Sequence, residues 1–142
     1  MTSTTSNPAT SATTAVTNGV DRFLDGAVNA IIATTDAWTD DATLDATVPG
    51  WRFTLSGADA IRAKLATWFV GVGRFEELRR LPTPGGEVVE YLLTWEEAGV
   101  RHAVHHVHLL TLATDGRIAD DHVFCGGRWD AALLAEMAAA GA

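Results

Sequence analysis

The stretch VRHAVHHVHLLTLATDGRIADDHVF, residues 100–124, predicts a pair of antiparallel strands and carries all five histidines of the chain. Thr114, Asp115 and Gly116 form a turn signal between two runs of apolar and β-branched residues. Side chains alternate between the two faces of a strand, so one face of the first strand carries His102, Val104, His106, His108, Leu110 and Leu112. We expect this mainly apolar face to line the interior.

The strand register decides which neighbours join this face. A connection over 96–99 brings the strand at 87–95 alongside, with Tyr91 and Trp95 facing inward. If the turn at 114–116 pairs Leu112 with Ile118, the inward residues of the last strand are Asp120, His122 and Phe124. A slip of one residue in that turn would place Asp121 inside instead of Asp120, and the sequence leaves this choice open.

The remaining segments predict helices that cover the sheet. Apolar residues recur at helical spacing within 20–41 and again within 56–73, and short strands separated by Pro49 and Gly50 are expected over 42–57. Two further strands are predicted at 74–81 and 87–95, and Asp130 is typical of the N-cap of a final short helix. The fold class is therefore α+β, with a curved antiparallel sheet wrapped around helices to form a cone with an apolar pocket.

Composition limits the domain count and the kinds of partner. The chain has 142 residues, and its Ser-, Thr- and Ala-rich start over 1–18 predicts a disordered tail before a single domain at 19–142. The net charge of −8 disfavours nucleic acid and anionic membranes as partners. Cys125 is the single cysteine, which excludes an internal disulfide and favours a cytoplasmic protein.

Four segments resemble the nuclear transport factor 2-like superfamily, and within it the SnoaL-like polyketide cyclases. They are WTDDATLDATVPGW (38–51), SGADAIRAKLATWF (56–69), EYLLTWEEAGVRHAVHHVHLLTL (90–112) and DGRIADDHVF (115–124), and the resemblance covers about Val20 to Trp129. It implies a cone-shaped pocket and an acid–base carboxylate on the last strand. The position of that carboxylate aligns with His122 here, which is a departure from the family pattern.

Histidines near a carboxylate in an apolar pocket favour general acid–base chemistry. We expect His122 with Asp120 to move a proton, and His106 and His108 to stabilise an enolate oxygen. The other residues expected to bind substrate are Tyr91, Trp95, Trp51, His102 and Phe124. The predicted activity is that of a lyase, isomerase or cyclase without a cofactor, acting on a hydrophobic, carbonyl-bearing or polycyclic small molecule.

Two other interpretations stay open. His106, His108 and His122 have the residue types and spacing of a three-histidine metal site, which would make the protein a metal-dependent enzyme. Alternatively, the pocket belongs to a non-catalytic ligand-binding or dimerisation module. In either case Leu92, Val107 and Leu109 on the outer face of the sheet predict a homodimer.

Overall fold

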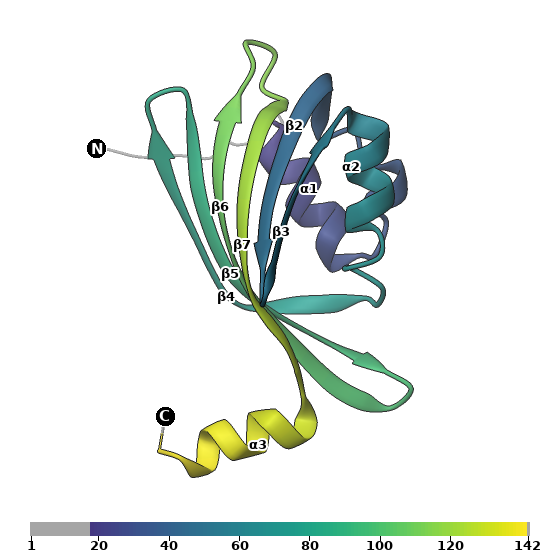
Figure 1. Cartoon of the computed structure of the whole chain (residues 1–142), viewed down its shortest axis with the longest axis vertical. Helices are drawn as coiled ribbons and strands as arrows, with labels where there is room; N and C mark the ends of the chain where they lie inside the picture. The colour runs from purple at the N-terminus through teal and green to yellow at the C-terminus, as the bar shows by residue number, and fades with distance from the viewer. Residues whose placement is uncertain (1–17, 142) are drawn as a thin grey trace, which may run out of the picture.

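The computed structural model describes residues 18–141, so nearly all of the predicted disordered tail lies outside the described residues. Helices α1 and α2 lie on one face of a curved sheet, and α3 lies beyond one end of it (Figure 1). The elements in chain order are α1 (Gly19–Val28), the 3₁₀ turn η1 (Ile32–Thr34), β2 (Trp38–Val48), β3 (Trp51–Ser56), α2 (Ala58–Leu65), β4 (Gly73–Thr83), β5 (Gly86–Glu97), β6 (Val100–Leu112), β7 (Ile118–Asp130) and α3 (Ala131–Ala139).

The six strands form one sheet in the order β3-β2-β7-β6-β5-β4. Four of the neighbouring pairs are antiparallel, whereas β2 and β7 run parallel. The predicted α+β class with helices on a curved sheet is confirmed, with the correction that the sheet is mixed. The hairpin of β2 and β3 comes from the first half of the chain and adds to the free edge of the four-strand meander.

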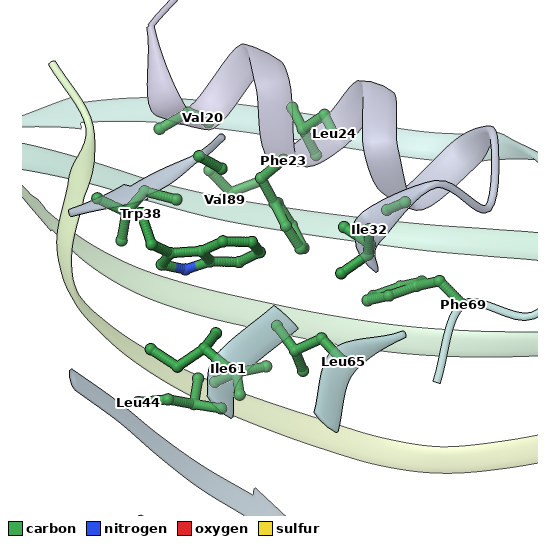
Figure 2. Close-up of a cluster of buried hydrophobic side chains, with 14 of the residues drawn as sticks. Val20, Phe23, Leu24, Ile32, Trp38, Leu44, Ile61, Leu65, Phe69 and Val89 are labelled. Atoms are coloured by element: carbon green, nitrogen blue, oxygen red, sulfur yellow. The ribbon is translucent and has the colours of Figure 1, made fainter. Parts of the chain in front are cut away.

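Helix α1 closes the concave face of the sheet. Asn18 caps it by accepting a hydrogen bond from the Asp21 N–H at 3.0 Å, and the Asp21 carboxylate accepts one from the Asn18 N–H at 3.0 Å. The inward face of the helix buries Val20, Phe23, Leu24 and Ala27. Figure 2 shows Phe23 pointing from α1 into the cluster that contains Trp38, Ile61 and Leu65.

The first helix is shorter than the sequence predicts. It ends at Val28, and Trp38 begins β2 instead of lying near the end of the helix. Ala30 takes a left-handed conformation with φ of 57°, which turns the chain away from the helix axis. In β2, the buried residues Ala42, Leu44 and Ala46 alternate with Thr and Asp residues. This period of two is typical of a strand and begins only after the helix has ended.

The turn between β5 and β6 is tighter than the predicted connection over 96–99. Ala98 and Gly99 occupy it alone, with φ of 51° and 78°, and Glu97 pairs with Val100. The register therefore moves by two residues, which keeps every side chain on its predicted face. Tyr91 consequently lies opposite His106, where the longer connection would have placed it opposite Val104.

A β-bulge after the last turn changes the faces of β7. Leu112 pairs with Ile118 as predicted, but the next pair joins Thr111 to Asp120, so Ala119 is an extra residue on β7. Each following residue is displaced by one and its side chain moves to the opposite face. Asp121, Val123 and Cys125 therefore point inward, whereas Asp120, His122 and Phe124 lie on the outer face.

Arg80 joins the sheet to the first helix, and its loss should destabilise the fold. Its guanidinium donates to the buried Glu87 and, at 2.6 Å, to Asp21 of α1. Arg80→Met leaves the Glu87 carboxylate buried without a cation, so we expect a loss of about 1–3 kcal/mol in the free energy of unfolding. The neighbouring Arg79 is exposed and pairs with Glu90 at 3.3 Å, so Arg79→Met should change stability by less than about 1 kcal/mol. Urea unfolding of the two variants tests this difference.

Candidate active site

Three adjacent strands bring four polar side chains into the apolar interior. Tyr91 comes from β5, His106 and His108 from β6, and Asp121 from β7. All four are almost fully buried, with His106 the most exposed at 1%. Burial of so many polar groups is costly unless each finds a partner.

The four side chains form one continuous hydrogen-bonded chain. Asp121 Oδ1 lies 2.9 Å from His108 Nδ1, and His108 Nε2 lies 3.0 Å from the Tyr91 hydroxyl. The same hydroxyl lies 2.8 Å from His106 Nδ1. His106 Nε2, the fourth nitrogen of the two histidine rings, has no hydrogen-bond partner among residues 18–141, and the same holds for the buried Asp121 Oδ2 and Trp38 Nε1. A buried polar atom without a partner is uncommon and often marks a functional position.

Burial determines the protonation states of His106 and Tyr91. Desolvation lowers the pKa of His106 well below the ordinary histidine value, and the neighbouring His108 and His105 lower it further. Desolvation also raises the pKa of Tyr91 well above its ordinary value, with Asp121 and Cys125 contributing. At neutral pH, His106 is therefore an uncharged imidazole and Tyr91 an uncharged phenol.

His106 lies at the wall of an apolar cavity of about 300 Å³. Trp68 contacts its ring at a centroid distance of 5.5 Å, and Phe69 packs edge-on at 5.9 Å. The cavity is lined by Val48, Pro49, Thr67, Trp68, Trp95, Val104, His106, Cys125, Gly127 and Arg128. Burial raises the pKa of the Cys125 thiol, so this thiol stays protonated and is a poor nucleophile. The size and lining suit a small hydrophobic molecule with few polar atoms.

Arg128 brings a positive charge to the same cavity. Its guanidinium lies 5.5 Å from the centre of the Trp95 ring and pairs with Glu97 on β5. Trp95 in turn donates from its indole nitrogen to Glu97 at 3.0 Å. The three side chains hold one another, so the guanidinium is fixed at the cavity wall.

The predicted site residues divide into two groups. His106, His108 and Tyr91 lie inside as expected, and Trp95 lines the cavity. His102 stacks on Trp95 at 5.7 Å without lining the cavity. The interior placement of three other residues is wrong because the bulge at Ala119 turns them outward, and these residues are Asp120, His122 and Phe124. Trp51 is also misplaced, since it is 69% exposed on β3.

On the outer face, Asp120 and His122 belong to a separate polar cluster. His122 Nε2 lies 3.1 Å from Asp120, and Asp120 also accepts a hydrogen bond from the Thr43 hydroxyl at 2.5 Å. Asp45 nearby receives two hydrogen bonds from Arg52, at 2.9 and 2.7 Å. The Arg52 hydrogen bonds lower the pKa of the Asp45 carboxyl. Each charged side chain of this outer cluster therefore has a partner of opposite charge, as is usual for groups on a protein surface.

The predicted three-histidine metal site does not form. His122 lies on the opposite face of the sheet from His106 and His108, so the three imidazoles do not converge. His106 Nδ1 and both nitrogens of His108 are already engaged in the hydrogen-bonded chain. Within residues 18–141, no three His, Cys, Asp or Glu side chains are placed to hold one metal ion.

The sequence named Asp121 only as an alternative to Asp120, and it did not assign Cys125, Trp68 or Arg128 to the site. The straight strand register favoured Asp120 over Asp121, although the sequence left open which of the two faces inward, and the same register placed Cys125 on the outer face. Trp68 falls within the helix expected over 56–73, but α2 ends at Leu65 and the chain that follows carries Trp68 to the cavity wall.

Comparison with solved structures identifies the fold as nuclear transport factor 2-like. An NTF-2 like protein of unknown function from Burkholderia xenovorans LB400 is 17% identical, with 75% of this chain and 79% of that chain covered and a TM-score of 0.56. An LEH-like epoxide hydrolase from M. tuberculosis is 20% identical over the same shares of the two chains, also at a TM-score of 0.56. The predicted fold is thereby confirmed.

A further neighbour is SalBIII, an epoxide hydrolase/cyclase-like enzyme with a role in pyran ring formation in polyether salinomycin. It is 20% identical, covers 75% of this chain and 86% of its own, and has a TM-score of 0.54. The fold thus occurs in enzymes of hydrolase and cyclase type as well as in proteins of unknown function. No family model and no curated protein matches the sequence. None of the helices formed by residues 18–141 has the length and apolar character needed to cross a lipid bilayer.

Proposed function

We propose that the protein is a cofactor-independent acid–base enzyme of isomerase, lyase or cyclase type, with His106 as the group that moves the proton. The observation that carries the proposal is the buried, uncharged imidazole of His106, whose Nε2 has no partner and whose ring lines the apolar cavity. The lowered pKa keeps the imidazole unprotonated at neutral pH, and a lone pair at Nε2 can then accept a proton as a general base. The enzymes among the fold neighbours support a reaction of this broad kind.

The substrate is a hydrophobic molecule with a carbonyl group and an acidic C–H bond beside it. His106 Nε2 removes this proton, and the developing enolate oxygen faces the guanidinium of Arg128. Trp95 and Val104 supply apolar contacts for the rest of the molecule. Because His106 is only 1% exposed and its Nε2 is buried, the substrate must displace the neighbouring Trp68 side chain to reach Nε2.

Proton exchange at carbon tests the proposal without knowledge of the natural substrate. The probe is 2-tetralone, a bicyclic ketone small enough for a cavity of about 300 Å³. In D₂O the protein should incorporate deuterium beside the carbonyl at least about 10²-fold faster than buffer of the same pH. Proton NMR measures the exchange, because the C–H signals beside the carbonyl disappear as deuterium replaces the protons.

Naphthalene is the matched control, because it has the same shape without an exchangeable proton or an oxygen atom. It should compete for the cavity and slow the exchange of 2-tetralone. Binding of 2-tetralone without exchange would contradict the enzyme and favour a non-catalytic ligand-binding module. Exchange that naphthalene does not slow would place the chemistry outside the apolar cavity.

A further inference from the structure

The hydrogen-bonded chain behind His106 continues far beyond what removal of a proton from a substrate requires. Tyr91, His108 and Asp121 are buried, and none of them lines the cavity. Each link joins groups that can both give and accept a proton, except at the carboxylate end. Removal of a proton by His106 alone therefore does not explain why these three residues are hydrogen-bonded in series behind it.

The carboxylate fixes the direction of every hydrogen bond in the chain. A carboxylate at Asp121 only accepts, so the arrangement that fits it has the His108 proton on Nδ1, which donates to Asp121 Oδ1. Asp121 Oδ2 has no hydrogen-bond partner among residues 18–141. The neutral His108 ring then accepts at Nε2 from the Tyr91 hydroxyl, and the Tyr91 oxygen accepts from His106 Nδ1–H. His106 Nε2 is left with a bare lone pair, which is the basic form that proton removal needs.

We propose that Tyr91, His108 and Asp121 form a proton relay that carries the charge of an accepted proton away from His106. When Nε2 of His106 gains a proton, its Nδ1 passes one to the Tyr91 oxygen. The Tyr91 hydroxyl at the same time passes its own proton to His108 Nε2. His106 ends neutral with the proton on Nε2, Tyr91 is again a phenol, and His108 is an imidazolium that donates to the Asp121 carboxylate.

The relay places the positive charge where the protein can stabilise it. A charge on His106 would lie among Trp68, Phe69 and Tyr91, where desolvation makes it unfavourable. A charge on His108 lies 2.9 Å from a buried carboxylate, and charge-assisted hydrogen bonds are among the strongest in proteins.

The titratable groups that face the relay lie on three strands, and the aromatic rings that pack on it come from α1 and from the segment after α2. Tyr91 comes from β5, His106 and His108 from β6, and Asp121 and Cys125 from β7. His105 on the outer face of β6 also acts on His106 through its charge. Phe23 from α1 packs on His108 at 4.9 Å, and Trp68 and Phe69 pack on His106.

The relay gives His106 two roles in one turnover, and in this respect it rests on the proposed function. Before proton transfer, Nε2 of His106 carries a lone pair. After transfer, when every hydrogen bond of the relay has reversed its direction, the same Nε2 carries a proton. The same nitrogen therefore removes a proton from one carbon and returns it to another atom of the substrate, as an isomerase or cyclase requires. Tyr91, His108 and Asp121 act as positioning residues, since they reach the substrate only through His106.

Nitrogen NMR of histidine-labelled protein tests the relay in the absence of any substrate. The pH is lowered from about 8 to about 5, on either side of the ordinary imidazole pKa of about 6.5. His106→Gln and His108→Gln proteins assign the ring signals. We expect His106 to change from the Nδ1–H to the Nε2–H form while staying neutral, and His108 to become the imidazolium in the same step. An imidazolium at His106, or a His106 tautomer that stays constant while His108 titrates, would overturn the relay.

Tyr91→Phe removes the hydroxyl and keeps the ring, so it breaks the chain with little loss of packing. The tautomer change at His106 should disappear, and protonation of its Nε2 should shift to lower pH by at least about one pKa unit. His105→Gln, on the outer face of the same strand, is the matched control and should keep the coupled step. An unchanged titration in Tyr91→Phe would contradict the relay, and the wild-type titration decides the question if this variant does not fold.

The two proposals fail in different ways. Coupled tautomers without deuterium exchange of 2-tetralone would keep the relay and reject the enzyme. Exchange that depends on His106 without coupled tautomers would keep the enzyme and reject the relay.

Discussion

His106→Gln should lower the rate of deuterium exchange into 2-tetralone by about 10²–10⁴-fold, the usual contribution of a general base. Glutamine has a similar length and remains polar, but its side chain has no basic nitrogen at neutral pH. The affinity for naphthalene should change little, because the apolar walls of the cavity stay in place. Exchange followed by proton NMR and naphthalene binding followed by tryptophan fluorescence separate the two effects.

His105→Gln is the matched control for this loss. It changes the same residue type on the same strand, but His105 faces outward and pairs with Glu90 at 3.0 Å. Exchange should change far less in this variant than in His106→Gln, because His105 acts on His106 only through its charge. Full exchange in His106→Gln combined with its loss in His122→Gln would contradict the proposed base and restore the assignment based on the straight strand register.

The sequence was sufficient to place the interior face of the histidine strand. Strict alternation over Val100–Leu112 separates His106 and His108 from His105, and burial follows that separation. The length of the turn before this strand was misjudged, yet an error of two residues leaves the faces unchanged. Tyr91 was therefore predicted inside correctly, although its partner across the ladder was not.

The last strand could not be placed because a single residue decides its faces. Ala119 has no side-chain feature that marks it as a bulge, and a bulge depends on how two strands twist against each other. The parallel pairing of β7 with β2 adds a second constraint, since Thr43 and Asp120 lie side by side in the sheet. Because β2 and β7 are far apart in the sequence, local residue patterns do not predict that they pair.

The proposed site depends on this same irregularity. With a straight β7, Asp120 would have taken the inward position opposite Leu110 that Asp121 occupies, and His122 would have faced inward opposite His108. The bulge instead brings Asp121 to within 2.9 Å of His108 and leaves His106 as the one histidine at the cavity wall. A bulge that redirects side chains next to a functional site is a common use of this feature. On the outer face, Leu109 and Phe124 are each nearly half exposed, and the homodimer stays a prediction.

Phe23→Ala should be among the most destabilising single substitutions, with a loss of about 3–5 kcal/mol in the free energy of unfolding. The Phe23 side chain is fully buried and packs on Trp38 and Phe69 at centroid distances of 5.8 Å each, and on His108 at 4.9 Å. Its removal leaves a void between α1 and the sheet, because these rings cannot all move inward to fill it. Guanidinium unfolding followed by circular dichroism measures the loss.

Phe124→Ala provides the control, since it deletes the same side chain from a residue that is 46% exposed on the outer face. Its cost should be about 1 kcal/mol or less, in the range of surface substitutions. The comparison also tests the register of β7, because a straight strand would bury Phe124 beside His106 and make both substitutions costly. Equal losses in the two variants would contradict the bulge at Ala119 and, with it, the inward position of Asp121 on which the relay depends.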